Sequence, residues 1–498
     1  MAEPMKAAPS AEMGDITRRS IRGGIVTVGA RMVIVFINLA STVVLARLLT
    51  PDDFGVLAMV LSVTAFVGVF RDFGLSTASV QRGAQLGPVE ASNLFWLNVL
   101  VGLALTAIVA AAAPAVGWLF AAPQAVPVTL ALSLSFALAG LGNQHAATLQ
   151  RLMLFHRKAL ADIVGAALTL AVTVVLAFRG GAYWSLVWGT LAGTAATSLL
   201  TVALSPLRIQ RPRRDPHTRD LLRFGGHVTA FELINYFHRN LDNVLIGRFW
   251  GAEALGLYSR AYQLLMFPIT NLRAPINAVA FTAMVHLKDR PEDFRAYYCK
   301  VSFLLAMVSM PLVAFLAVAA EEVVALLLGP RWMGVVPIFQ VLAATAFIQP
   351  VASLRGLVAL SSGRSGDYLK LGIINAVAVC IAFAAGLPWG PLGVAAGYGI
   401  AVYALLWPTL RLTFRGTGIR MQDFGRSVAQ SAAASVGAGG AVLLATGLLH
   451  GVQHLAAVVL GIKLLVFFLA WLLFNLLWPQ GFARLRSGFA ALRQMRRR

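Results

Sequence analysis

The sequence predicts an all-α integral membrane protein with about 14 transmembrane helices, arranged as two parallel six-helix lobes plus two extra helices. Three observations support this fold: the composition, a series of apolar runs and an internal repeat. The chain has 498 residues, of which 58% are hydrophobic and 12% charged, with a mean hydropathy of +0.76. Soluble domains average roughly 45–50% apolar and about 25% charged residues, so the composition excludes an ordinary soluble protein.

The apolar runs have the length that a membrane-crossing helix needs. The hydrocarbon core is about 30 Å thick, so about 20 apolar residues are enough to cross it as a helix. The connections are short, and we expect no sizeable domain outside the membrane. The runs lie near 23–48, 53–80, 92–113, 125–148, 160–178, 182–205, 223–249, 253–285, 296–319, 333–358, 368–386, 391–410, 427–449 and 454–478.

Basic residues in alternate loops predict the orientation. The N-terminus, every second loop and the C-terminus together hold about 30 of the 41 Lys and Arg residues. The opposite set of loops has only Arg47, Arg179, Arg248 and Arg331. We therefore expect both termini in the cytoplasm. The net charge of +21 mostly reflects this topology, so nucleic acid is not a predicted partner.

The two ends of the chain and the cysteines add little chemistry. Residues 1–22 are polar, and the first span is expected to be an uncleaved anchor. The tail 479–498 places apolar residues at helical intervals among arginines, which favours an amphipathic helix on the membrane surface; a frayed basic tail is the alternative. Cys299 and Cys380 have no metal-ligand or disulfide spacing.

An internal repeat predicts two lobes. A shift of 201 residues places Arg47 and Gly55 on Arg248 and Gly256 within the similar segments RLLTPDDFGVLA and RFWGAEALGLYS. Six spans separate the copies, and because this number is even both lobes insert in the same direction. The predicted parts are a cytoplasmic segment 1–22, lobes at 23–205 and 223–412, a basic linker at 206–222, two additional helices within 427–478 and the tail 479–498.

The segment 223–286 organises the rest of the chain. It is long enough for two spans joined by a turn at Gly251, yet it carries several ionisable side chains. Each ionisable group near the bilayer centre costs roughly 2.5–3.5 kcal/mol on insertion scales, so these charges must face protein or water. Pro268 and Pro275 allow the second of these spans to bend.

The polar positions also follow the repeat. Arg31, Asn38 and Thr42 share one helical face, and the shift of 201 residues places them on Glu232, Arg239 and Asn243. Asn38 and Thr42 alone fit interhelical hydrogen bonding, whereas the charged members favour a hydrated cavity. The predicted cationic lumen consists of Arg31, Asn38, Arg71, Arg239, Asn243, Arg260 and Arg273. Such a chamber prefers an anion, because guanidinium groups match phosphate oxygens.

Other ionisable residues have two interpretations each. Arg71 and Asp72 are adjacent and can neutralise one another. Arg355 and Lys463 either snorkel toward headgroups or line the cavity. Glu232, Asp242 and Asp72 are candidates for ion coupling, because a carboxylate in a low-dielectric wall can exchange a proton; the alternative is a permanent ion pair with a neighbouring arginine. No catalytic or metal site and no cofactor is predicted, with a proton or sodium gradient as the candidate energy source.

The segments ARLLTPDDFGVLAMVLSVTAFVGVFRDFGLSTASVQ and RNLDNVLIGRFWGAEALGLYSRAYQLLMFP resemble the Wzx-type oligosaccharide flippases of the multidrug/oligosaccharidyl-lipid/polysaccharide exporter superfamily. The resemblance implies a V-shaped pair of six-helix bundles plus two helices in the bacterial inner membrane. It implies transfer of an undecaprenyl-diphosphate-linked repeat unit to the periplasmic leaflet by alternating access, for exopolysaccharide or lipopolysaccharide export. Partners would be lipid-linked oligosaccharide diphosphate, membrane lipids, a polysaccharide polymerase and a chain-length regulator.

Two other functions remain as alternatives. A drug exporter of the same superfamily would need an acidic, aromatic-lined chamber for organic cations, and the excess of arginine opposes it. A polyprenyl-dependent glycosyltransferase or polymerase would use the paired carboxylates of Asp52 and Asp53. The equivalent repeat positions are Glu253 and Ala254, and an acidic residue after Pro51 is also a common way to begin a helix. The sequence thus favours a transporter over an enzyme.

Overall fold

The computed structural model describes residues 10–71, 74–76, 79, 86–213, 216–447 and 456–479. Side chains are described in these ranges except at 10–22, 25, 216–239, 274, 275, 278 and 365. Every regular element in the described ranges is a helix. The predicted tail 479–498, apart from its first residue, lies outside them, as does Asp72. The chain divides into two compact units, Met1–Asn240 and Leu241–Arg498, which we call the N-unit and the C-unit.

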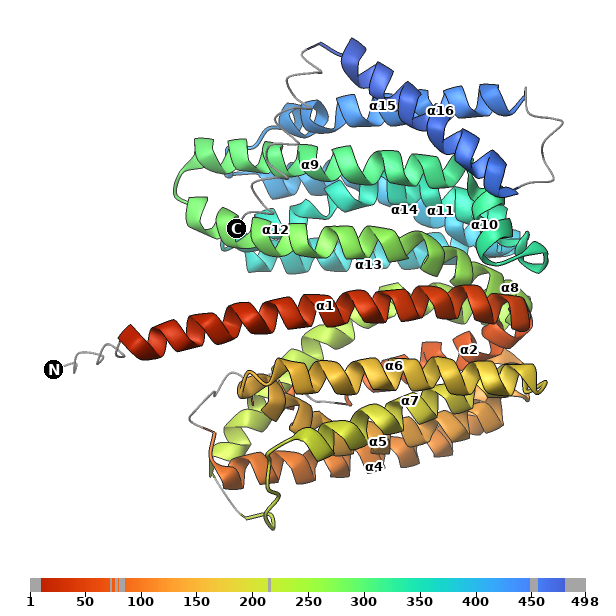
Figure 1. Cartoon of the computed structure of the whole chain (residues 1–498). Coiled ribbons are helices and arrows are strands. Elements are labelled where there is room, and N and C mark those ends of the chain that lie inside the picture. The colour runs from red at the N-terminus through yellow and green to blue at the C-terminus, as the bar shows by residue number, and fades with distance from the viewer. Residues whose placement is uncertain are drawn as a thin grey trace. The chain divides into compact units, whose positions relative to one another are not determined.

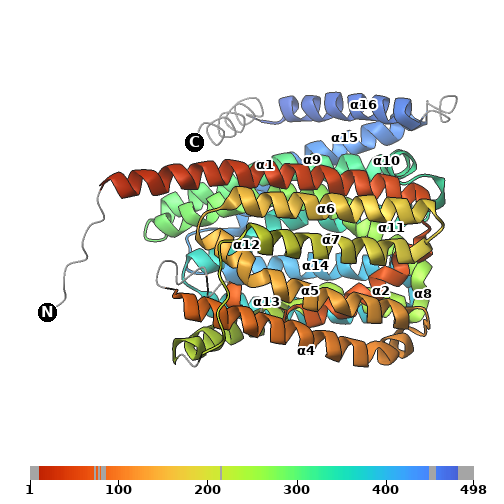
Figure 2. The same ribbon diagram turned by 60° about the horizontal axis from the view of Figure 1, so that its bottom comes forward.

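The N-unit is built from long antiparallel helices. In both views α4 to α7 run side by side (Figure 1, Figure 2), and α4 packs on α5, α6 on α7 and α1 on α6. The helices are α1 (Ser10–Leu48), α2 (Pro51–Gly68), α4 (Pro88–Phe120), α5 (Ala125–Arg151), α6 (Phe155–Phe178) and α7 (Ala182–Leu204). The boundary between the units falls inside α8 (Pro216–Leu287).

The C-unit contains the remaining helices around its own buried apolar core, which includes Tyr298, Met310 and Phe414. Its helices are α9 (Pro291–Val318), α10 (Ala320–Leu327), α11 (Val335–Ala352), α12 (Leu354–Ser361), α13 (Ser365–Gly386), α14 (Gly390–Phe414), α15 (Met421–Thr446) and α16 (Ala456–Leu477). The last pair, α15 and α16, packs together, and α15 also packs on α9.

The predicted number of membrane spans is confirmed. Eleven stretches in the described ranges are long and apolar enough to cross a membrane, and one of them, Gly366–Phe414, contains both α13 and α14. The charged helix α8 adds two more segments, because Gly251 interrupts it with non-helical φ/ψ angles of 83° and −175°. Together these are the 14 segments, so the protein is a multi-pass, all-α membrane protein. Helical angles continue through Pro268 and Pro275.

The repeat places a chain reversal at the same position in both copies. Thr50 lies at the α1–α2 junction with an extended backbone (φ −91°, ψ 163°), and the shift of 201 residues places it on Gly251. Thr50 caps α2 together with Asp53, whereas the positive φ at Gly251 requires a residue without Cβ. The two sequences therefore achieve the same break by different local chemistry.

Several helix boundaries differ from the predicted span limits by more than a turn; α1, for example, begins at Ser10 and α8 at Pro216, where 23 and 223 were predicted. The third span was expected to end at 113, but α4 continues through Pro114 to Phe120. A single proline removes one backbone donor, and neighbouring helices can compensate for that loss in a membrane. The second span was expected to reach 80; α2 ends at Gly68, and five of the nine residues from 72 to 80 lie outside the described ranges.

Small residues bring α6 and α7 close together. A Cβ atom placed on Gly189 would lie 2.9 Å from the carbonyl oxygen of Thr169, and one on Gly193 would lie 2.8 Å from that of Gly165. Both separations are shorter than real Cβ contacts, so any side chain there would push the helices apart. Close backbone approach through small residues is a common way to pack helices in lipid.

Candidate functional site

A buried carboxylate lies beside the break in α8. Asp242 is 6% exposed and accepts hydrogen bonds from the Tyr258 hydroxyl (2.9 Å) and the Asn243 backbone N–H (2.8 Å). Tyr258 is 1% exposed and follows Gly251, so this bond joins the two halves of α8. A buried carboxylate inside a membrane protein is costly unless hydrogen bonds stabilise it, and Asp242 has two.

An arginine is held between three helices of the C-unit. Arg355 on α12 donates hydrogen bonds to Thr409 Oγ1 of α14 (3.0 Å) and to Asn375 Oδ1 of α13 (3.2 Å). Both partners are neutral, so neither cancels the positive charge. The guanidinium therefore lies among protein groups, and its predicted position, snorkelling toward headgroups or lining the cavity, stays a prediction. An arginine held by neutral partners inside a membrane protein is suited to an anionic ligand.

A third polar contact of the C-unit involves Tyr398 of α14. Its hydroxyl accepts a hydrogen bond of 2.7 Å from the Gln349 side chain of α11. Hydrogen-bonded polar groups thus occur on α8, α11, α12, α13 and α14. We refer to these three hydrogen-bonded sets together as the C-unit polar network; its members are Asp242 and Tyr258, Gln349 and Tyr398, and Arg355 with Asn375 and Thr409.

The other predicted residues of the C-unit lie on α8. Arg260 is half-buried and donates a 2.8 Å hydrogen bond to Gln263 Oε1, its neighbour one turn along the helix. Arg273 and Asn243 are half-buried. Glu232 and Arg239 lie in α8, where the structure describes the backbone but not their side chains. The roles of all these residues in binding or coupling stay predictions.

The predicted residues of the N-unit are on or near its surface. Arg31 and Asn38 are exposed on α1, and Arg71 is exposed after α2. The Thr42 hydroxyl donates to the backbone carbonyl of Asn38 in its own helix (2.9 Å), so this bond does not connect two helices. The predicted meeting of arginines from both lobes in one lumen stays a prediction.

Two ion pairs join the additional helices α15 and α16 to other helices of the C-unit, α9 and α10. Lys463 of α16 lies 2.7 Å from Glu322 of α10, with side-chain exposures of 8% and 13%, and also donates to the Val318 carbonyl (3.2 Å). Arg295 of α9 contacts both carboxylate oxygens of Asp423 on α15 at 2.6 and 2.7 Å. Lys463 thus forms an ion pair between α16 and α10, and its predicted positions, toward the headgroups or in the cavity lining, stay predictions.

The carboxylate pair that the enzyme alternative required is divided between two environments. Asp53 Oδ2 accepts hydrogen bonds from the Thr50 backbone N–H (2.9 Å) and hydroxyl (2.8 Å), which completes a capping box, while Asp52 is exposed. The described part of the chain contains no group of three His, Cys, Asp or Glu residues able to hold a metal ion. The carboxylate of Asp53 is therefore explained by its role in capping α2.

Sequence reasoning missed two sets of polar residues. Gln349 and Tyr398 occur singly within apolar runs and carry no charge, so hydropathy gives no signal for them. Asn98, Gln144 and His145 are buried on α4 and α5, in spans whose composition predicted no role for them. The GNQH segment at 142–145, four residues without a large apolar side chain inside a span, was the available signal.

Known proteins resemble this chain in sequence and fold. A family model described as "Polysaccharide biosynthesis protein" matches residues 44–337. The lipopolysaccharide biosynthesis protein WzxC of Escherichia coli K12 is 26% identical over 77% of this chain and 78% of its own length. The succinoglycan biosynthesis transport protein ExoT of Rhizobium meliloti is 26% identical over 73% of this chain and 72% of its own length.

Among solved structures, the lipid II flippase MurJ in an inward closed conformation aligns with a TM-score of 0.73 at 14% identity, covering 91% of this chain and 98% of MurJ. This likeness shows the shared fold. The sequence matches confirm the resemblance found in the two repeat motifs. Because the family model covers more than half of the residues, the chain belongs to the polysaccharide biosynthesis protein family.

Proposed function

We propose that the protein is a flippase that moves a polyprenyl-diphosphate-linked oligosaccharide across the bacterial inner membrane by alternating access. Its relatives WzxC and ExoT are named for lipopolysaccharide biosynthesis and succinoglycan transport, and the fold is shared with a lipid II flippase. A flippase needs no bond-making machinery. It needs a polar path for the sugar and phosphate groups and a membrane-facing opening for the lipid chain.

The observation that carries the proposal is Arg355. A guanidinium held by the neutral side chains of Thr409 and Asn375 keeps its charge available for an anion. The tyrosines and amides of the C-unit polar network offer hydrogen bonds of the kind that sugar hydroxyls make. A lipid diphosphate carrying an oligosaccharide presents both chemical groups in one molecule.

Orientation and localisation belong to the same proposal. The excess of basic residues in one set of loops supports cytoplasmic termini and an inner-membrane location. The substrate would then enter from the cytoplasmic leaflet and leave in the outward leaflet. A polysaccharide polymerase and a chain-length regulator would act on the product there.

An ion gradient is the energy source that we propose. Asp242 is buried, and its hydrogen bond to Tyr258 joins the two halves of α8 across the break at Gly251. Binding and release of a proton or sodium ion at Asp242 would change the charge next to this break. Glu232 and Asp72 remain further candidates for this role.

Deletion of the gene tests the proposed function in the cell. We expect one surface polysaccharide to be lost while its lipid-linked precursor accumulates with the sugar facing the cytoplasm. Accessibility to a membrane-impermeant glycosidase, applied to inverted and right-side-out vesicles, measures this orientation. Complete absence of the precursor would instead identify a synthase, and normal surface polysaccharide together with drug sensitivity would identify a drug exporter.

A further inference from the structure

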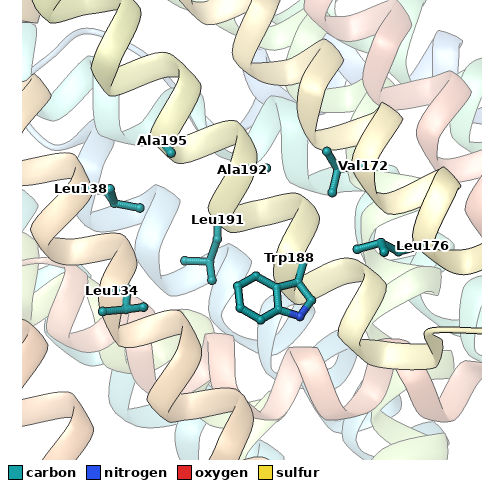
Figure 3. A pocket seen from close by; sticks show the side chains of 8 residues that line it. All are labelled: Leu134, Leu138, Val172, Leu176, Trp188, Leu191, Ala192 and Ala195. Atoms are coloured by element: carbon teal, nitrogen blue, oxygen red, sulfur yellow. The ribbon is translucent and has the colours of Figure 1, made fainter.

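The N-unit has an apolar groove of about 610 Å³ between α5, α6 and α7. Figure 3 shows the side chains around it, which come from all three helices and are all apolar except for the indole nitrogen of Trp188. Leu134 and Leu138 belong to α5, Val172 and Leu176 to α6, and Leu191 to α7. Trp188 is 50% exposed, so the groove reaches the surface of the unit. We call it the α5–α7 groove.

Arg179 lies at the end of the groove where α6 joins α7, on the same face of α6 as the residues that line the groove. Val172, Leu176 and Arg179 are spaced by four and three residues, which places them on one helical face. Arg179 is exposed, and its side chain has no hydrogen-bond or ion-pair partner among the residues that the structure describes. An unneutralised guanidinium thus follows directly after the apolar stripe of α6.

Aromatic residues mark the same end. Trp184 stacks on Trp188 with ring centroids 6.3 Å apart, and Trp184 precedes the groove residues of α7 by one turn. Tryptophan concentrates at the membrane–water boundary, where its ring meets both hydrocarbon and headgroups. The groove therefore extends from the headgroup region of one leaflet into the hydrocarbon region.

The groove matches a lipid with one chain and a phosphate at its head. Apolar walls gain dispersion contacts only when hydrocarbon fills the space between them. The three helices line a single groove, which we match to a lipid with one long chain rather than to a glycerophospholipid with two. The guanidinium of Arg179 at the end of the α5–α7 groove complements a phosphate group, with which arginine forms paired, charge-assisted hydrogen bonds.

We propose that the α5–α7 groove binds the polyprenyl chain of a lipid diphosphate while Arg179 contacts the diphosphate. In the proposed orientation the α6–α7 turn faces outward, so the groove is the site through which the translocated lipid leaves the protein. This inference rests on the proposed function and orientation. It adds a lipid-binding site in the N-unit that is separate from the C-unit polar network.

A photo-crosslink in the groove tests the proposal. The full-length protein with Trp188 replaced by p-benzoylphenylalanine is reconstituted in phosphatidylcholine vesicles containing radiolabelled undecaprenyl diphosphate, and the yield of labelled protein is measured. The matched control carries the same replacement at Trp118, which is 79% exposed on α4 outside the groove. We expect a yield at 188 about tenfold above that at 118.

The guanidinium is tested in the same background. Arg179→Gln should lower the yield about tenfold, because it removes a charge-assisted contact, while Arg248→Gln, which removes another exposed arginine of the same predicted membrane side, should leave it unchanged. Excess unlabelled undecaprenyl diphosphate should abolish labelling and phosphatidylglycerol should not. Equal competition by phosphatidylglycerol, or equal yields at 188 and 118, would overturn the assignment.

A parallel flipping assay separates this inference from the function on which it rests. If the unmodified protein flips the lipid but the variant with the crosslinker at 188 is not labelled, the groove site is refuted and the proposed function stands. Labelling at 188 by a protein that moves no lipid-linked oligosaccharide would show a lipid site in a protein of another function. Loss of both would remove both proposals.

Discussion

The ion pair between Lys463 and Glu322 makes the sharpest prediction about stability. The two charges are 2.7 Å apart, and their side chains are only 8% and 13% exposed. Lys463→Met removes the ammonium group and leaves the Glu322 carboxylate buried without its cation. Breaking a buried pair in this way costs about 3–5 kcal/mol, because the remaining charge has neither water nor a counter-ion. We expect the free energy of unfolding to fall by that amount.

Reversible unfolding in mixed detergent and dodecyl sulfate micelles, followed by circular dichroism, measures the change. The double variant Lys463→Met/Glu322→Gln removes both charges and should recover most of the loss, so the cycle isolates the interaction between them. Lys158→Met is the matched control. Lys158 and Asp162 form a pair of almost the same length, 2.6 Å, but their side chains are 26% and 33% exposed.

The control pair connects one turn of α6 and should contribute about 0.3–0.5 kcal/mol. Equal losses for Lys463→Met and Lys158→Met would show that burial does not determine the strength of the Lys463 pair. A double variant that is less stable than either single one would also contradict the reasoning, because it would mean that packing rather than charge holds α16.

Four further predictions test other parts of the structure. Arg355→Gln should slow flipping about tenfold, with Arg355→Lys intermediate, because a lysine keeps the charge but not the paired geometry; equal rates would exclude Arg355 from substrate binding. Asp242→Asn should abolish the response of flipping to an imposed ion gradient while Tyr258→Phe keeps it, and an unchanged response would exclude Asp242 from coupling. Gly193→Ala should destabilise by about 1–3 kcal/mol in the same unfolding assay, against no loss for Gly440→Ala in open surroundings. Asp53→Ala should cost about 0.5–2 kcal/mol as a lost helix cap and leave flipping intact, and abolished activity in a folded variant would revive a catalytic role.

Much of the fold could be predicted because the membrane imposes a strong pattern on the sequence. Apolar runs of the required length predicted every span, and charged residues within the segment 223–286 did not hide its two helices. The turn at Gly251 was predicted from glycine and the repeat, and it is the one position of non-helical angles in α8. Boundaries were less certain where a proline, such as Pro114, does not end a helix in lipid.

The site was predicted less completely, because hydropathy identifies charged residues but not the residues with which they form ion pairs or hydrogen bonds. Lys463 stands out in an apolar helix, yet its partner Glu322 lies 141 positions earlier in the chain, and no spacing rule connects them. Arg355 was noticed, whereas the neutral side chains that hold it, Thr409 and Asn375, are unremarkable in sequence. Pairing of this kind depends on tertiary packing.

The most direct measurement is flipping by the purified protein. Proteoliposomes containing the full-length chain and a fluorescent undecaprenyl-diphosphate-linked oligosaccharide are treated with a membrane-impermeant quencher, and the protected fraction is followed over time. We expect the protein to expose the protected lipid to the quencher, and Arg355→Gln to slow this exposure. A protected fraction that stays constant, while the same vesicles accumulate a lipophilic cation, would contradict the assignment as a lipid-linked oligosaccharide flippase.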